Sequence, residues 1–284
     1  MMYLERRPCR LLQPFVRSLW LAWDPEARRS RSLERVLPNG CMQLILNLAG
    51  DVLHDVSGPV ERASAPALIV GTYRNFQTIA VEDLEDLAGV VLRPGGFTPL
   101  FGLPAHAFSD RETTLEVAWG VHAEDLRERL RSTSSSDERM RLLEAALVDL
   151  ALKRGARDGC KVTKFTLDEI GAGVSISEIA RKTGLSLGRL GERFRREVGV
   201  TPKTFDRIQR FQRVVQQINK GVKTPGAELA LECGFFDQAH FSHEFRSFSG
   251  MSPTEYQSFE RKWNNHVPST KDREISTRRA DRKA

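Results

Sequence analysis

The chain has 284 residues, of which 40% are apolar and 28% carry a formal charge. These fractions are typical of globular proteins and exclude disordered, collagen-like and disulfide-scaffold chains, while the length favours two domains. The four cysteines stand singly without a C-x-x-C pair, which argues against a zinc site or a disulfide framework. No apolar run is long enough to span a membrane and residues 1–8 do not resemble a secretory signal, so we expect a cytoplasmic protein with no membrane partner.

The net charge of +6 is unevenly distributed along the chain. Residues 1–160 have 20 Lys and Arg against 22 Asp and Glu, whereas residues 161–284 have 23 against 15. A basic C-terminal half is typical of proteins that bind nucleic acid or another acidic surface. The last 24 residues alone contribute 8 basic against 3 acidic side chains, so charge is a weak argument for the rest of that half.

The first 110 residues have the pattern of β-strands. Apolar and other residues alternate from Met42 to Leu48, and short β-rich runs follow at 67–70, 76–81 and 89–92. Glycine- and proline-containing turn sequences separate these runs. The pattern predicts an N-terminal β-rich domain, a small barrel or sandwich, that extends to residue 155 with its closing helices.

The closing helices of this domain begin after residue 113. The second of them, beginning near Asp137, has a stripe of apolar residues at three- and four-residue spacing: Met140, Leu143, Leu147, Leu150 and Ala151. Such a stripe packs into the core or forms a dimer seam, and the sequence leaves both open. Residues 153–164 are interpreted as the interdomain linker.

An internal repeat occupies the C-terminal half. The first copy contains Ala180, Gly184, Leu190, Phe194, Arg195, Gly199 and Pro202. The second copy contains Ala230, Gly234, Phe241, Phe245, Arg246, Gly250 and Pro253. The offset is 50 residues before the turn and 51 after it, which predicts two copies of one supersecondary unit.

The spacing within each copy is typical of a helix-turn-helix unit. Gly184 and Gly234 are placed to end the first helix in the left-handed conformation, and Ser186 and Asp237 to cap the second. A plain pair of helical hairpins without a ligand is the alternative. Residues 202–219, between the copies, predict a helix of about 25–30 Å, comparable with the distance of about 34 Å between successive major grooves.

Residues 174–259 resemble the DNA-binding domain of the AraC/XylS family of bacterial transcription regulators. The segments that carry this resemblance are 176–180, 190–199, 234–246 and 251–256. With the N-terminal pattern it implies an α+β protein: a β-rich barrel or sandwich-like domain with helices, then an all-α domain over residues 165–260 with two helix-turn-helix units joined by a linker helix. The resemblance also implies sequence-specific binding of promoter DNA through two recognition helices in adjacent major grooves. It further implies regulation of transcription, which in this family is usually activation through contact with RNA polymerase.

The outward positions of the two predicted recognition helices are the candidate DNA contacts. In the first unit they are Arg189, Glu192, Arg195 and Arg196. In the second unit they are Gln238, Ala239, His240, Ser242, His243 and Arg246. Gln238 can pair with adenine, and Arg189 is the candidate for a base edge in the first unit. The remaining arginines are candidates for phosphate contacts. Glu192 either accepts a hydrogen bond from cytosine or pairs with a neighbouring arginine.

Gly188 and Gly191 depart from the family pattern, in which such outward positions more often carry long polar or basic side chains. The two glycines shorten the reach of the first recognition helix and cost about 0.8–1 kcal/mol each relative to alanine. We therefore expect the second unit to contribute more of the base discrimination. His240 and His243 stand at i and i+3, but no third ligand lies near them in the sequence and no metal is expected. The basic residues near the start of the linker helix are expected to face the DNA backbone: Lys203, Arg207 and Arg210.

The N-terminal domain is interpreted by analogy as a sensor of a small-molecule effector, with a homodimerisation module as the second hypothesis. It contains no motif of a hydrolase, a zinc protease or a dinucleotide-binding enzyme, so no cofactor and no catalytic residue is expected. The alternative from another class is a DNA-binding domain fused to a catalytic one, such as an adaptive DNA-repair methyltransferase with Cys9 as its thiol. Residues 264–284 are basic and polar without periodicity and predict a disordered tail.

Overall fold

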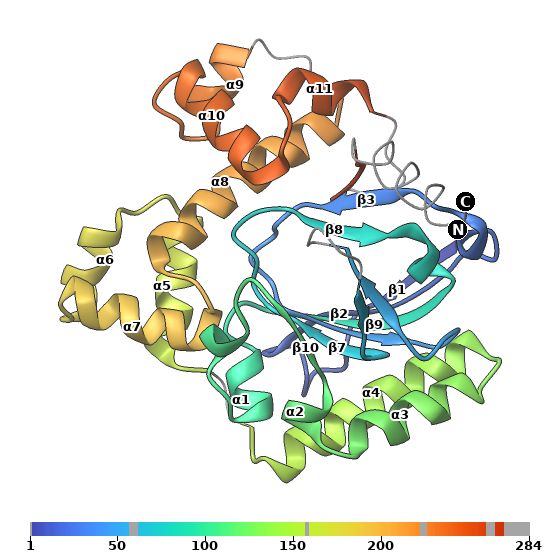
Figure 1. Ribbon diagram of the computed structural model, residues 1–284. Helices are drawn as coiled ribbons and strands as arrows, with labels where there is room; N and C mark the ends of the chain where they lie inside the picture. Colours follow the sequence, from blue (N-terminus) through green and yellow to red (C-terminus); the bar gives the residue numbers. More distant parts are fainter. Residues whose placement is uncertain (1, 57–61, 157–158, 222–225, 260–264, 270–284) are drawn as a thin grey trace.

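The computed structural model describes residues 2–56, 62–156, 159–221, 226–259 and 265–269. Two β-sheets with helices beside them form the N-terminal part, and the rest of the chain is almost entirely helical (Figure 1). The α+β class expected from the sequence is confirmed. We call residues 2–156 the N-terminal domain and residues 159–259 the C-terminal domain. Within the described ranges, no helix combines the length and apolarity that crossing a membrane requires.

Eleven strands of the described chain form two antiparallel sheets. The six-stranded sheet has the order β1 (Met2–Arg6), β2 (Val16–Trp23), β9 (Asp86–Leu92), β4 (Gln43–Asn47), β7 (Ala67–Val70) and β10 (Glu112–Thr114). The five-stranded sheet has the order β11 (His266–Pro268), β3 (Leu33–Val36), β8 (Gln77–Ala80), β5 (Leu53–Asp55) and β6 (Arg62–Ser64). Short 3₁₀ segments connect some of the strands: η1 (Ala27–Arg29), η2 (Val81–Leu84) and η3 (Ala105–Phe108).

The core of the N-terminal domain centres on β4, which pairs with β9 on one side and β7 on the other. The alternation read from the sequence is confirmed, because Leu44 and Leu46 are completely buried. Burying a leucine side chain contributes about 1.5–3 kcal/mol to the free energy of unfolding. Gly89 on β9 lies against the indole of Trp20, where an added Cβ would stand 2.1 Å from Cζ2. This contact admits no larger residue.

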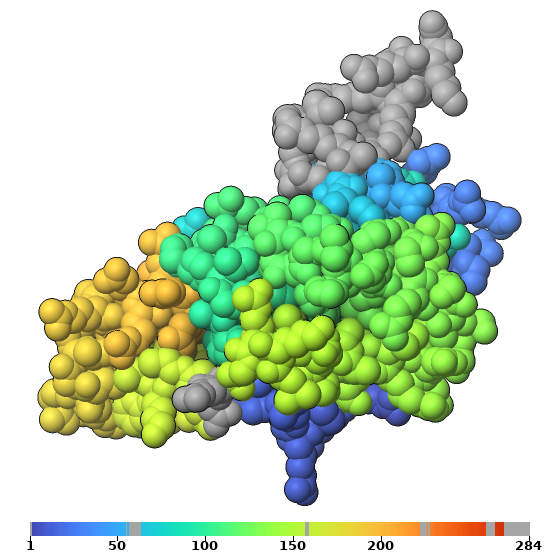
Figure 2. Space-filling view, turned by 90° about the horizontal axis from the view of Figure 1, so that it is seen from below, coloured from blue at the N-terminus to red at the C-terminus, as the bar shows by residue number. Residues whose placement is uncertain are grey.

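In the described ranges, four helices complete the N-terminal domain: α1 (Phe97–Phe101), α2 (Glu116–Trp119), α3 (His122–Arg131) and α4 (Ser136–Lys153). Figure 2 looks onto the side of the molecule that α3 and α4 cover in green. The stripe of α4 lies in the same apolar cluster as the buried leucines of β4. It is therefore core packing of a single chain, and the dimer-seam interpretation of these residues is wrong.

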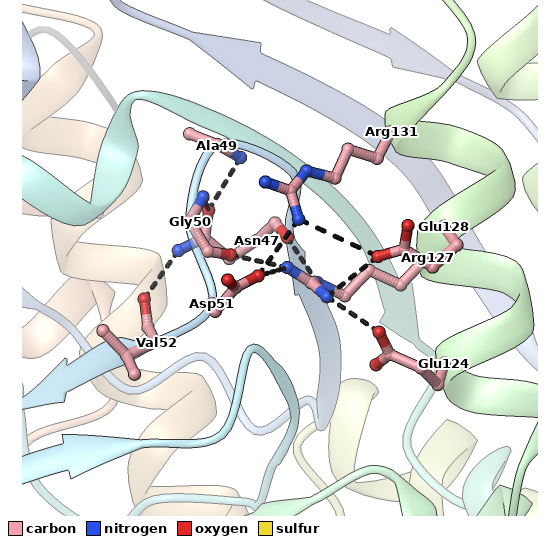
Figure 3. A network of polar contacts seen from close by, with 9 residues as sticks. All are labelled: Asn47, Ala49, Gly50, Asp51, Val52, Glu124, Arg127, Glu128 and Arg131. Atoms are coloured by element: carbon pink, nitrogen blue, oxygen red, sulfur yellow. Dashed lines mark hydrogen bonds and ion pairs between the residues drawn. The ribbon is translucent and has the colours of Figure 1, made fainter.

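A buried arginine joins α3 to the turn after β4 (Figure 3). The Arg127 side chain is only 3% exposed. Its guanidinium donates to two backbone carbonyls and three carboxylates, those of Asn47 (2.8 Å), Gly50 (2.7 Å), Asp51 (2.7 Å), Glu124 (2.9 Å) and Glu128 (3.2 Å). The hydrogen bond from Arg127, together with nearby positive charge, lowers the pKa of Asp51. The network ties a helix to a sheet through groups distant in the chain.

The C-terminal domain consists of seven helices in the described ranges: α5 (Lys161–Gly171), α6 (Ile176–Thr183), α7 (Leu187–Val198), α8 (Pro202–Asn219), α9 (Gly226–Glu232), α10 (Gln238–Ser249) and α11 (Pro253–Ser258). Each helix-turn-helix unit has its own apolar core. The long helix α8 contributes Phe205 to the first core and Phe211 to the second. One helix thus connects the two units, as the sequence predicts.

The chain returns to the N-terminal domain after α11. His266–Pro268 form β11, which pairs antiparallel with β3, and the ring of His266 lies 2.9 Å from a carboxylate oxygen of Glu34. The prediction of disorder from residue 264 is wrong for this strand, because Val267 is buried and the edge of β3 supplies backbone partners. Residues 270–284 lie outside the described chain.

Candidate nucleic-acid interface

The first helix-turn-helix unit is built by local signals. Ser186 caps α7 by accepting a hydrogen bond from the backbone N–H of Arg189 at 3.3 Å. Gly184, with φ of +67°, ends α6 in the left-handed conformation, which glycine adopts without strain. Leu190 and Phe194 are buried one turn apart, so the intervening residues of α7 face outward.

The second unit repeats this construction. Asp237 caps α10 through the backbone N–H of His240 at 2.7 Å, and Gly234 has a φ of +84°. Phe241 and Phe245 are buried at the positions that match the first unit. The repeat in the sequence is thus a repeat of two capped twelve-residue helices, α7 and α10.

The candidate contacts of the first unit are all exposed on α7: Arg189, Glu192, Arg195 and Arg196. In the described chain, none of these four side chains has an ion pair. Glu192 therefore does not form the pair with a neighbouring arginine that the sequence left open. These four candidates present three cationic groups and one carboxylate to solvent, and Arg193 on the same helix is exposed as well.

The candidate contacts of the second unit all lie on α10. Four of them are exposed and two are partly exposed: Gln238, Ala239, His243 and Arg246, then His240 and Ser242. Nδ1 of His240 accepts a long 3.4 Å hydrogen bond from the Phe236 backbone, and its ring stands edge-on to Phe235. No group of three potential metal ligands occurs among the described residues, so His240 and His243 have no third ligand there.

Gly188 and Gly191 stand on the outward side of α7. A Cβ added at either position would meet no atom within 4 Å. Packing within the chain therefore does not require glycine there. The two positions line a groove between α7 and the η3 segment. The other residues that line this groove are Leu187, Glu192, Arg195, Arg196, Pro104, His106 and Thr201.

Two of the three basic residues expected on the DNA backbone are used inside the protein. Arg207 donates to both carboxylate oxygens of Glu244 on α10, at 2.7 and 2.6 Å. Arg210 donates to the carbonyl of Gly234 and lies over the Phe235 ring. Both side chains thus have partners in the second unit, and their contact with the DNA backbone stays a prediction. Lys203 is exposed.

The N-terminal domain contacts the first unit where α7 ends. The hydroxyl of Thr72 donates to the carbonyl of Val198 at 2.8 Å, and the hydroxyl of Ser109 donates to that of Gly199 at 2.6 Å. Carbonyls at a helix C-terminus lack partners within the helix. The hydroxyls of Thr72 and Ser109 supply these hydrogen-bond partners from the N-terminal domain.

The second unit is contacted at the matching place. Arg35 of β3 donates to the carbonyls of Ser249 and Gly250, at 3.4 and 3.3 Å, and lies over the ring of Phe76. Gly250 ends α10 as Gly199 ends α7. One domain thus holds the C-terminal ends of both helices that carry the candidate contacts. No periodicity or motif in the sequence indicates this arrangement.

Cys9, on which the methyltransferase alternative depends, is exposed. Its backbone N–H donates to a carboxylate oxygen of Glu144 at 2.6 Å. The carboxylate of Glu144 thus lies next to the backbone of Cys9.

Two capped helices on one scaffold, each with an outward polar face, define a double helix-turn-helix domain. Residues 179–258 match the family model described as a helix-turn-helix domain. The C-terminal domain thus contains a helix-turn-helix domain, in the part of the chain whose sequence resembles the AraC/XylS family of transcription regulators. Residues 4–114 match a second family, described as a domain of unknown function (DUF6597).

A curated relative matches part of the chain. A protein named "Probable transcriptional regulator LumQ", from Photobacterium leiognathi, is 34% identical over 86 residues, which are 30% of this chain and 34% of that protein. The match thus spans about a third of the length of that curated relative.

Solved structures give matches of low TM-score. A DNA-binding transcriptional dual regulator from Escherichia coli K-12 is 27% identical, covers 34% of this chain and 90% of its own, and has a TM-score of 0.28. Unsaturated fatty acid-bound ToxT from Vibrio cholerae is 11% identical, covers 90% of this chain and 93% of its own, and has a TM-score of 0.36.

Proposed function

We propose that the protein is a sequence-specific regulator of transcription that inserts α7 and α10 into adjacent major grooves of promoter DNA. The observation that carries the proposal is the pair of capped helices with exposed polar faces, joined by α8. The 18-residue helix α8 measures about 27 Å, so it can hold α7 and α10 at two major grooves about 34 Å apart.

The exposed side chains divide into two kinds of contact. Arg189 and Gln238 stand near the N-terminal ends of their helices, where recognition helices contact base edges. Arginine pairs with guanine and glutamine with adenine, each through two hydrogen bonds. Glu192 accepts from cytosine, and His240 and His243 contact base edges.

The remaining candidates contact the DNA backbone or close the interface. Arg195, Arg196 and Arg246 lie one or two turns further along their helices and bind phosphates. Ala239 and Ser242 are small enough to allow a close approach of α10 to the groove.

Selection of bound fragments from a random DNA pool by the full chain tests this proposal. We expect two short motifs about one helical turn apart. Arg189→Ala and Gln238→Ala are each expected to cost about 1–3 kcal/mol of binding free energy and to relax specificity at one position. Arg195→Ala is expected to weaken binding to all sequences and to reduce the salt slope by about 1.

Arg129→Ala, an exposed arginine on α3, is the matched control and should leave binding unchanged. Recovery of a single motif would contradict the two-helix arrangement. Loss of specificity in Arg189→Ala without any loss in Gln238→Ala would contradict the larger share of discrimination assigned to the second unit.

We further propose that the N-terminal domain regulates DNA binding through its contacts with the ends of both recognition helices. A change in that domain would alter the relative placement of α7 and α10. The partners of this regulation are a small-molecule effector, a second copy of the chain in a homodimer, and RNA polymerase at an activated promoter. Light scattering of the full chain with and without the selected DNA measures the oligomeric state.

A further inference from the structure

A cavity of about 390 Å³ lies between the two domains. Its walls come from the loop after β9, from α5, from the last turn of α7 and from the start of α8. Small-molecule sites commonly have volumes of about 300–1,000 Å³ and lie at domain interfaces. The cavity thus has the size and position of a ligand site.

Two residues of its lining, Thr163 and Glu197, each have a buried polar atom without a partner. Thr163 is 3% exposed, and its hydroxyl has no hydrogen bond in the described chain. The hydroxyl of Thr166, on the same helix, donates to the carbonyl of Val162 at 2.7 Å. Oε2 of Glu197 on α7 is also buried without a partner. Leaving a buried polar group unpaired is unfavourable, so both atoms lack a hydrogen-bonding group that a ligand would bring.

The charged side chains of the lining are of both signs. Arg93 and Lys164 are cationic, and Asp168 and Glu197 are carboxylates. None of the four has an ion pair within the described chain, and Arg93 uses only its Nε, on the carbonyl of Gln13 at 2.7 Å. A zwitterion, which carries an ammonium group and a carboxylate, complements both signs.

We propose that this cavity binds a small zwitterion of the amino-acid class. Its ammonium group donates to Glu197 and Thr163, and its carboxylate accepts from Arg93 and Lys164. The ring of Phe205 forms part of the apolar wall that receives its side chain.

Binding there acts on the first recognition helix, and this consequence rests on the function proposed above. Glu197 precedes Val198 and Gly199, the two residues that the N-terminal domain holds. A ligand that contacts Arg93 on one domain and Glu197 on the other connects the domains at that point. It therefore stabilises the docked arrangement of α7 relative to any arrangement in which the domains separate.

Isothermal titration of the full chain without DNA tests the site independently of DNA binding. The panel contains amino acids, the amines that lack their carboxylate and the carboxylic acids that lack their amino group. We expect at least one amino acid to bind, and both of its truncated analogues to bind at least about 10-fold more weakly. The absence of binding by any amino acid, or equal binding by either analogue, would overturn the proposal.

Variants locate the site. Glu197→Gln is expected to weaken binding of that amino acid about 10- to 100-fold, whereas Glu138→Gln, exposed on α4, is the matched control and should bind as the parent does. Thr163→Val removes the unpaired hydroxyl, so it should bind several-fold more weakly without any fall in the melting temperature of the free protein. Unchanged binding in both Glu197→Gln and Thr163→Val would place the ligand elsewhere and refute the site.

Fluorescence anisotropy with the selected DNA, with and without the amino acid, then tests the coupling. A change in DNA affinity on addition of the amino acid, absent in Glu197→Gln, supports it. Titration heat without any DNA binding would leave the cavity site standing and reject the proposed function.

Discussion

Replacing Glu244 by glutamine tests the link between α8 and the second recognition helix. The Glu244 side chain is 8% exposed and accepts two hydrogen bonds from Arg207, whose side chain is 34% exposed. Breaking a fully buried ion pair costs about 3–5 kcal/mol. Because Arg207 stays partly hydrated, we expect Glu244→Gln to lower the free energy of unfolding by about 2 kcal/mol.

The effect depends on pH in a defined direction. Burial acts to raise the pKa of Glu244, but the hydrogen bonds and charge of Arg207 outweigh it, so the pKa lies below its ordinary value of 4.5. A carboxyl group with a lowered pKa stabilises the folded state above its ordinary pKa, and this stabilisation is lost as the pH falls through the lowered value. The difference between the parent and Glu244→Gln should be constant near neutral pH and shrink below about pH 4.5.

Urea denaturation followed by circular dichroism, at neutral and acid pH, measures this difference. Glu178→Gln is the matched control, because Glu178 forms the same kind of two-bond pair with Arg181 on the solvent-exposed side of α6. Exposed pairs contribute little. A loss of stability in Glu244→Gln no larger than that in Glu178→Gln would refute the reasoning.

Three further predictions concern other contacts. Gly188→Ala and Gly191→Ala should each raise the free energy of unfolding by up to about 1 kcal/mol in thermal denaturation, because the added methyl meets open space; a fall would contradict this. Arg127→Met should lower it by about 1–3 kcal/mol in chemical denaturation, since it leaves the carbonyls of Asn47 and Gly50 without their donor while the three carboxylates stay exposed to water; an unchanged value would show the network to be dispensable. Thr72→Val combined with Ser109→Ala should increase hydrogen exchange of backbone amides at the end of α7, with unchanged exchange arguing against the interdomain contact.

The amino-acid sequence by itself determined the features that depend on neighbours within a few residues. Three kinds of local feature could be predicted from the sequence: the alternation of β4, the caps Ser186 and Asp237, and the glycines that end α6 and α9. Repetition of the same local signals made the second unit predictable from the first. These signals also placed the outward faces of α7 and α10, because burial of one helix face turns the other toward solvent.

The tertiary structure alone decided which residues meet across long stretches of chain. Arg207 points to Glu244 rather than outward, and Arg35 reaches the end of α10, more than 200 residues away. The pairing of β11 with β3 and the meeting of Thr163 with Glu197 around one cavity have the same origin. Periodicity and capping report only local geometry, whereas these contacts depend on how the two domains pack, and that packing follows from the combined burial of many separate surfaces.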